Sequence, residues 1–512
     1  MSDKSAQIEK VEPLQGGQLL AAGLLLAISN FVVVLDMTIA NVSVPHIAGG
    51  LAVSPNEGTY VITSYAVAEA ISVPLTGWIA ARFGNVKAFC VSMIMFGIFS
   101  ALCGLAGSIG FLVFARIFQG LAGGPLMPLS QTLLMRAFPP AKRGVALALW
   151  SMTTLIAPIL GPIVGGYICD NWGWEYIFYI NIPIALICGF VAFGLLSRFE
   201  TKILKAKIDY IGMALLVGWV APLQYVLDEG KTLDWFSSPL IVFLIVVAVI
   251  TFFSFLIWEL TEEHPIVDLR IFRHRGFTAA TTTISFAFGA FFGTVVLVPL
   301  WLQSYMGYNA TWSGIVGAST GVLAVVAAPF AAMMSQKFDP RKLVFFGVAW
   351  LGIWTYFRAF GTTDMTAWQV AWPMLIQGIG MPFFFIPLTS LALASVNEGE
   401  DASAAGLMSF LRTLAGAIAT SLVTTSWENK ATEFRSDLTA NSISPEKFSQ
   451  MLGETSDPQV ATGMLDNLIQ SQAIMLSTNH VLMVASVTFI FAASAIWLAP
   501  KPTRKVEMGG GH

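Results

Sequence analysis

Long apolar stretches recur along almost the whole chain and are separated by short polar segments. The stretch from Val61 to Ala81 is typical, because only one of its 21 residues, Glu69, is charged. A membrane-crossing helix needs roughly 20 mainly apolar residues, so each stretch predicts a transmembrane span. Fourteen spans are predicted, beginning near Gln18, Tyr60, Ala88, Phe111, Val145, Tyr176, Ile208, Pro239, Phe277, Thr311, Leu343, Trp368, Ala402 and Val481. The expected fold class is an all-α polytopic membrane protein.

Two short patterns in the first half of the chain recur in the second half. Pro74–Arg82 is matched 255 residues later by Pro329–Lys337, where both segments end in a basic residue. Gln119–Gly120 recurs 258 residues later as Gln377–Gly378. An offset of eight spans gives both copies the same direction across the membrane. Parallel repeats of this kind are typical of transporters whose substrate path runs between the halves.

The repeat predicts how the chain is divided. We expect a cytoplasmic segment at residues 1–17, a six-helix bundle at 18–198, two inserted helices at 208–260, a second six-helix bundle at 277–500 and a cytoplasmic tail at 501–512. The second bundle includes a long polar external segment, residues 427–477, with helix-like stretches at Pro445–Leu452 and Pro458–Gln470. That segment is compatible both with a docking surface and with a loop that has no function.

Composition and charge agree with a membrane protein and orient it. Hydrophobic residues make up 56% of the 512 and charged residues 11%, a balance that a soluble chain of this size does not have. Alternate connecting segments, together with both chain ends, hold twenty of the 27 Lys and Arg residues. Basic residues concentrate on the cytoplasmic side, so both termini are predicted to be cytoplasmic. The polar residues 1–17 lack the features of a signal peptide.

Four charged residues lie inside predicted spans: Asp36, Glu69, Arg116 and Arg412. Ionisable groups at membrane depth are costly and commonly mark ion or proton pathways. We expect Arg116 to be the buried counter-charge of Asp36 or of Glu69, and a change in its distance from Asp36 to load and release a proton. Glu69 is expected to be a second proton site or a counter-charge for cationic substrates. Arg412 is the corresponding buried charge of the second half. A structural polar cluster that only joins helices is the alternative for each.

Other chemistry is not indicated by the sequence. The four cysteines lie in or near spans, and the five histidines have no metal-ligand spacing, so neither a disulfide framework nor a metal site is expected. Gly230–Thr232 resembles the end of a phosphate-binding loop, but Tyr225 stands where the first glycine of that loop would be. We therefore expect no cofactor, no nucleic-acid partner and no enzymatic activity.

The fifth predicted span carries glycines and prolines at short spacing. Gly161 and Gly165 are four residues apart, which allows two helix backbones to approach closely. Pro158 and Pro162 lie among them, and Gly166 follows. Proline removes a backbone donor from a helix interior, so a kink is expected here.

With these motifs in view, the chain resembles the major facilitator superfamily, and within it the fourteen-span drug:proton antiporters, closest to the EmrB-type multidrug export proteins. The resemblance rests on Leu35–Pro45 in span one, on the Gly77–Lys87 loop, on Arg116–Gly124 and on Gly161–Gly166, which is similar to the antiporter motif. It extends from about Leu14 to Pro500.

The resemblance implies a fold and an activity. It implies a major facilitator fold that exports hydrophobic or amphipathic compounds across the bacterial inner membrane in exchange for protons. A periplasmic adaptor and an outer-membrane channel are the implied partners. Drugs, uncouplers, bile salts and fatty acids all fit as substrates. A solute:proton symporter on the same fold is the main alternative, and a membrane enzyme acting on lipid would need a catalytic cluster that the sequence lacks.

The resemblance also assigns an inner gate to the loop between spans two and three. Gly77, Arg82, Gly84 and Lys87 match that motif, whereas Ala81 stands where the family usually has an aspartate. The charge pairing often assigned to that aspartate is therefore not expected in this chain.

Overall fold

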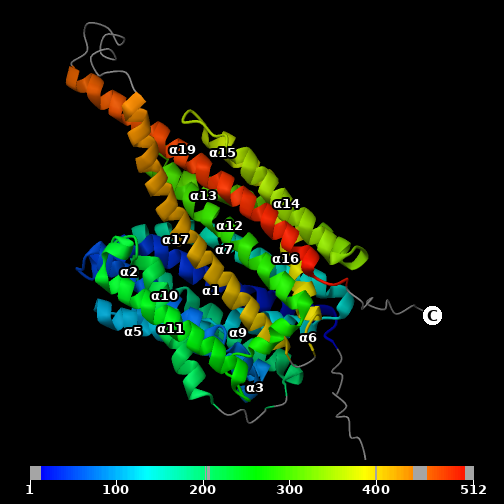
Figure 1. The fold of residues 1–512 in the computed structure, drawn as a ribbon. Coiled ribbons are helices and arrows are strands. Elements are labelled where there is room, and N and C mark those ends of the chain that lie inside the picture. The colour runs from blue at the N-terminus through cyan, green and yellow to red at the C-terminus, as the bar shows by residue number, and fades with distance from the viewer. Residues whose placement is uncertain are drawn as a thin grey trace, which may run out of the picture.

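The computed structural model describes residues 13–201, 203, 208–308, 310–397, 400–441 and 458–501, and within them the chain is helical without strands. The first half comprises α1 (Gly16–Gly50), α2 (Pro55–Ser72), α3 (Thr76–Phe83), α4 (Asn85–Gly104), α5 (Ile109–Gly123), α6 (Leu126–Ala137), α7 (Pro140–Asn171), α8 (Tyr176–Tyr179) and α9 (Asn181–Leu196). Two further helices follow, α10 (Tyr210–Glu229) and α11 (Pro239–Thr261). The second half comprises α12 (Arg275–Ser304), α13 (Ala310–Lys337), α14 (Pro340–Arg358), α15 (Ala367–Gln377), α16 (Gly380–Ala394), α17 (Asp401–Asn441) and α19 (Pro458–Ala495). Figure 1 shows these helices as one elongated bundle.

Every predicted span coincides with one helix or with two consecutive helices. Two of the breaks within spans fall at proline or glycine: Pro74 lies between α2 and α3, and Gly124–Pro125 separates α5 from α6. Proline cannot donate a backbone hydrogen bond and clashes with the preceding turn, which explains where these spans divide. By contrast, α7 continues as one helix through Pro158 and Pro162.

Eleven helical regions of the described chain are long and apolar enough to cross a membrane. The three predicted spans outside this set begin near Tyr60, Val145 and Leu343 and correspond to α2–α3, α7 and α14.

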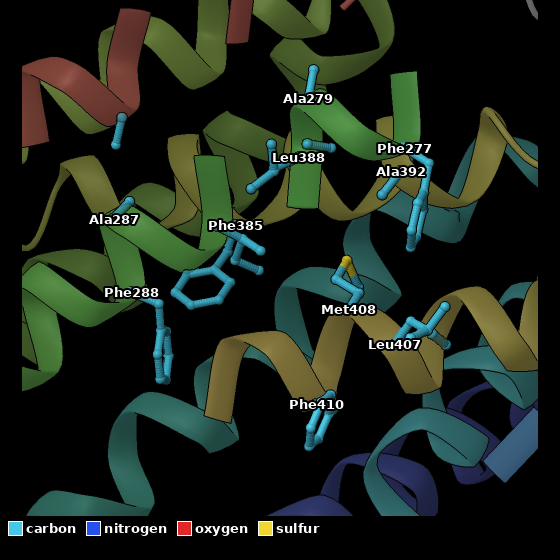
Figure 2. Close-up of a cluster of buried hydrophobic side chains, with 14 of the residues drawn as sticks. Phe277, Ala279, Ala287, Phe288, Phe385, Leu388, Ala392, Leu407, Met408 and Phe410 are labelled. Atoms are coloured by element: carbon cyan, nitrogen blue, oxygen red, sulfur yellow. The ribbon is translucent and has the colours of Figure 1, made fainter. Parts of the chain in front are cut away.

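The core of the second half is built from aromatic and aliphatic side chains of α12, α16 and α17. Figure 2 shows Phe288, Phe385 and Phe410 pointing into this cluster from those three helices. The Phe288 and Phe385 rings meet edge to face, with centroids 5.9 Å apart. Trp219 of α10 packs against Phe410 at 5.7 Å, so the inserted pair of helices shares the second half's core while α10 also contacts α2.

The two halves touch along α7 and α13 and also at one end of the bundle, here named the basic end because Arg82, Arg136, Arg273 and Arg341 lie there. A side chain at Gly77 of α3 would overlap Ser403 of α17. Arg136 of α6 pairs with Asp401 of α17 across 3.6 Å. The halves are therefore closed against each other at this end.

The polar segment expected as an external loop at residues 427–477 is largely helical where it is described. α17 continues to Asn441 and α19 begins at Pro458, so both helices project beyond the rest of the bundle (Figure 1). Arg435 and Asp466 tie the two projections together through a 2.7 Å ion pair. The predicted helix-like stretch at Pro458–Gln470 belongs to α19, and the one at Pro445–Leu452 lies outside the described residues. We name residues 427–441 and 458–477 the extension; Trp427 and Ile474 at its base are buried in the core of the second half.

Candidate functional site

Asp36 and Arg116 form a buried ion pair in the middle of the first half. Asp36 lies on α1 and Arg116 on α5, and an Arg116 Nη1 to Asp36 Oδ2 distance of 2.6 Å joins them. Asp36 is 2% exposed and Arg116 is fully buried. The geometry therefore joins Arg116 to Asp36, one of the two partners expected from the sequence.

Neutral side chains complete the surroundings of the Asp36 carboxylate. Oδ1 accepts hydrogen bonds from Asn181 Nδ2 at 2.6 Å and from Gln119 Nε2 at 3.2 Å. Gln119 also accepts from Arg116 through its Oε1, at 2.9 Å. Buried ions need such additional partners, because ion pairing alone does not recover the cost of leaving water. Three helices, α1, α5 and α9, meet at this carboxylate.

Arg116 is anchored on its other side by α2. Its Nε donates to the Val61 carbonyl at 3.1 Å, and its guanidinium lies 4.2 Å from the centre of the Tyr65 ring. Within the described residues, Arg116 Nη2, Tyr65 Oη and Asn181 Oδ1 are buried polar atoms without a hydrogen-bond partner. The surroundings of the ion pair therefore contain hydrogen-bond donors and acceptors that have no partner among the described residues.

Glu69 is one turn of α2 beyond Tyr65. It is 9% exposed, and its carboxylate makes no hydrogen bond or ion pair with a described residue. Its carboxylate lies within electrostatic range of both Arg116 and Arg412. Glu69 therefore presents a carboxylate without a fixed partner, under the influence of one arginine from each half.

Arg412 extends from the second half to the first half. It lies on α17 and is 2% exposed. Its Nη2 contacts the Met127 sulfur of α6, and its guanidinium lies 5.3 Å from the centre of the Phe288 ring. The guanidinium of Arg412 in the second half therefore contacts the first half and lies within electrostatic range of Glu69.

Tyr65, Glu69, Ser72 and Thr76 recur along α2 and α3 as a row of polar residues, and the last two are hydrogen-bonded. Ser72 donates to the Gly120 carbonyl of α5 at 3.3 Å. Thr76 donates to the Val73 carbonyl at 2.6 Å, within its own span. Of these four side chains, Tyr65 and Glu69 are the two without a hydrogen bond to a described residue.

The glycines of α7 lie against α1. A side chain at Gly161 would overlap Thr38, and one at Gly165 would meet Ile39 at 3.2 Å. Thr38 Oγ1 donates across this contact to the Ala157 carbonyl at 3.3 Å. Gly166 faces open space instead. The close-packing prediction holds for Gly161 and Gly165, and α1 is the helix that packs against them.

The loop between α3 and α4 has a defined geometry at the basic end. Gly84 has a φ of +87°, a conformation that favours glycine. The Glu200 carboxylate accepts hydrogen bonds from the backbone N–H groups of Val86 and Lys87, each at 3.0 Å. It therefore caps the start of α4, where free N–H groups attract negative charge.

Asn181, Glu200 and Asp401 take part in this architecture although sequence reasoning did not select them. Asn181 was detectable as a polar residue at the start of an apolar span. Glu200 lies in a polar connection between helices and Asp401 at the first position of α17, where a carboxylate carries no special signal. Among the described residues, no group of three or more His, Cys, Asp or Glu side chains could hold a metal ion.

Comparison with known proteins places this geometry in a family. The family model described as Major Facilitator Superfamily matches residues 26–420. The multidrug export protein EmrB of Escherichia coli K12 is 42% identical over 510 residues, covering 98% of this chain and 100% of that protein. The fatty acid resistance protein FarB of Neisseria gonorrhoeae is 41% identical, covering 98% of this chain and 99% of that protein.

A solved structure gives the same fold at low sequence similarity. The proton:xylose symporter XylE matches with a TM-score of 0.59 and 14% identity, covering 94% of this chain and 96% of that one. At that identity the likeness concerns the fold alone. With the family model and the two relatives above, it shows that the chain belongs to the major facilitator superfamily of multi-pass membrane transporters, with EmrB-type export proteins among its relatives.

Proposed function

We propose that this chain exports hydrophobic or amphipathic compounds across the bacterial inner membrane in exchange for protons. The observation that carries the proposal is the buried Asp36–Arg116 pair, which is built between helices rather than within one. The relatives named for multidrug export and fatty acid resistance support export of such compounds. Both termini are proposed to face the cytoplasm, so the basic end is the inner end.

Proton coupling follows from the way the Asp36 carboxylate is held. Its donors come from α5 and α9, whereas Asp36 itself lies on α1. A conformational change that moves α5 away from α1 would remove the guanidinium. The carboxylate would then either take up a proton or remain as an uncompensated buried charge, which is far more costly. Proton binding and the conformation of the bundle are linked in this way.

Alternating access requires the contacts at the basic end to open. Gly77 against Ser403 and Arg136 with Asp401 hold the halves together there. Substrate entry from the cytoplasm would need these contacts to separate, and Glu69 and Arg412 lie where the compound would then pass. The mixed charge of that pair suits cations and anions alike.

We further propose that the extension binds the periplasmic adaptor of a tripartite pump. It projects beyond the other helices at the end opposite the basic end (Figure 1). Val460, Met464 and Leu468 are each about half exposed, at 51%, 50% and 51%, and lie four residues apart on α19. That spacing places them on one helical face, an apolar face suited to a protein partner.

The test is transport into inverted membrane vesicles energised with a proton gradient. The wild-type protein should accumulate a fluorescent amphipathic drug, and collapse of the gradient should abolish accumulation. Asp36→Asn should lose gradient-driven accumulation by about a hundredfold, as expected for loss of a group essential to the mechanism, while remaining in the membrane. Glu263→Gln, an exposed carboxylate on the basic end, is the control and should transport normally. Full gradient-driven transport by Asp36→Asn would disprove the coupling role, and uptake in the opposite direction would identify a symporter.

A further inference from the structure

A cavity of about 560 Å³ lies inside the second half, at the end opposite the basic end. Its walls come from α12, α14, α15, α19 and the connection between α14 and α15. All its lining residues lie between 298 and 482, so none belongs to the first half. The lining of the cavity therefore includes neither Glu69 nor Arg412. We name this cavity the second-half chamber.

A cation forms part of the wall of this chamber. Arg358, the last residue of α14, is partly buried there. Its Nη1 donates to Gln377 Oε1 at 2.8 Å, and Gln377 Nε2 donates to Thr355 Oγ1 at 2.8 Å. Asp364 also lines the chamber but is exposed and makes no ion pair with Arg358 within the described chain. The guanidinium is thus held in place by a neutral amide and lacks an anion.

The first half treats its buried cation differently. There Gln119 belongs to the pattern that recurs at Gln377, and it contacts Arg116, which Asp36 neutralises. At the 255-residue offset the position of Asp36 is occupied by Phe291 in the second half. The second half therefore repeats the glutamine and supplies a cation, but it provides no carboxylate of its own to balance the charge.

The remaining lining is mainly apolar and aromatic. Trp301, Trp372 and Met475 contribute from α12, α15 and α19. Phe357 and Phe360 also line the chamber and are 51% and 61% exposed, so it is not sealed from its surroundings. A volume of this size, with apolar walls and one polar anchor, matches small-molecule sites in proteins. A planar guanidinium is well suited to bind a carboxylate through two hydrogen bonds.

We propose that the second-half chamber binds an amphipathic anion, with the acid group on Arg358 and the apolar chain against Trp301, Trp372 and Met475. A long-chain carboxylate is the simplest ligand of this chemistry. The anion could be an exported compound held near the exit or an anionic lipid of the surrounding membrane. The proposal concerns binding at a site outside the central path, so it does not depend on proton-coupled export.

Photolabelling of the purified full-length chain tests this site without transport. The protein is placed in phosphatidylcholine nanodiscs and exposed to a palmitate analogue that carries a diazirine in its chain. Mass spectrometry should then find label on peptides that contain residues 357–373 or 475–482. Arg358→Gln should lower this labelling about tenfold, because one charge-assisted interaction is lost, whereas Arg358→Lys should retain most of it.

Matched controls separate the site from general membrane labelling. Arg435→Gln removes an exposed arginine at the same end of the molecule and should label like the wild type. The uncharged diazirine analogue of hexadecanol should not label the chamber. Wild-type labelling without dependence on Arg358, label only on residues between the halves, or no label on the chamber would overturn the proposal. If Arg358→Gln does not fold, the wild-type map and the hexadecanol comparison still decide the question.

Competition identifies the source of the anion. Phosphatidylglycerol added to the nanodiscs should displace the photolabel if an anionic lipid is the natural occupant. Displacement by unlabelled palmitate, with no effect of phosphatidylglycerol, would assign the chamber to a free amphiphile. Either result supports the anion site, because both require the same acid group on Arg358.

Discussion

Asp36, Arg116 and Glu69 differ in how completely their charges are compensated. Asp36 has an ion-pair partner and two amide donors, and Arg116 has a carboxylate, a backbone carbonyl and an aromatic ring. The carboxylate of Glu69 has neither a hydrogen bond nor an ion pair within the described residues. The first two therefore support the fold as well as the proposed coupling, while Glu69 contributes little to stability and can be removed at a lower cost.

Arg116→Ala should reduce both stability and transport. The substitution leaves Asp36 buried without its main counter-charge, a loss of about 3–5 kcal/mol for one partner of a buried pair. We expect lower membrane expression and a lower thermal unfolding temperature, measured by fluorescence-detected size exclusion after heating. Arg435→Gln, which breaks an exposed pair, should leave both values near wild type. Normal expression and unfolding temperature for Arg116→Ala would show that Asp36 is stabilised by other means.

Glu69→Gln should impair export while leaving the unfolding temperature close to wild type. The reason is that the Glu69 carboxylate makes no ion pair or hydrogen bond within the described chain. Export of cationic compounds should fall by about tenfold or more, because a charge-assisted contact is lost in a water-poor site. Neutral and anionic compounds separate the two roles. If their export falls as well and loses its dependence on pH, Glu69 is a proton site. If it persists, Glu69 is a counter-charge. Unchanged export of all three classes would leave only a structural role.

The charged members of the site were predictable because each interrupts a long apolar run, where an ionisable group has a high cost. Their partners were only partly predictable. Asn181 is uncharged and lies far from Asp36 in sequence, and its donation to Asp36 depends on the packing of α9 against α1. Arg358 lies at the end of α14, where a basic residue carries no special signal. Its importance emerges from the second-half chamber, which no local pattern encodes.

At the scale of helices, apolar length and proline position predicted most of the architecture. Helices occupy all the predicted spans, and the break after Ser72 falls at Pro74. The segment at 427–477 was harder to predict, because its polar composition is compatible with a loop. It is helical where described because α17 and α19 continue beyond the apolar core, and the Arg435–Asp466 pair joins the two continuations.

The contact between α1 and α7 gives a prediction at this scale. Gly161→Ala would place a methyl group against the side chain of Thr38 and 3.1 Å from its carbonyl carbon. Because the backbone cannot yield as a side chain can, α1 must shift, at a cost of about 1–3 kcal/mol for overpacking. The unfolding temperature of the purified protein should fall. Gly166→Ala is the matched control, because its methyl group meets open space. Equal unfolding temperatures for the two variants would show that α1 and α7 are not closely packed at Gly161.

At the scale of the whole molecule, the inserted helices and the closed basic end show what the sequence could not specify. The repeat predicted two halves and an insert between them in sequence. The position of α10, beside α2 and against Phe410 of α17, depends on which faces remain free once the halves have assembled. Direct contact at Gly77 and Ser403 defines one end state of the molecule. The proposed cycle needs a second state in which that contact is broken.

Substitutions in the extension test the assembly of the proposed tripartite pump separately from transport by this chain alone. Met464→Asp combined with Leu468→Asp places two charges on the exposed apolar face of α19. Because this face lies outside the transport core, accumulation in inverted vesicles should stay near wild type. Drug resistance of whole cells should instead fall about tenfold or more, as expected when charges enter the apolar centre of a protein interface. Asn467→Asp adds one charge to the same turn at an exposed polar position and should retain resistance. Resistance that survives the double substitution would show that the adaptor binds elsewhere, whereas loss of vesicle transport would show that the extension belongs to the transport cycle itself.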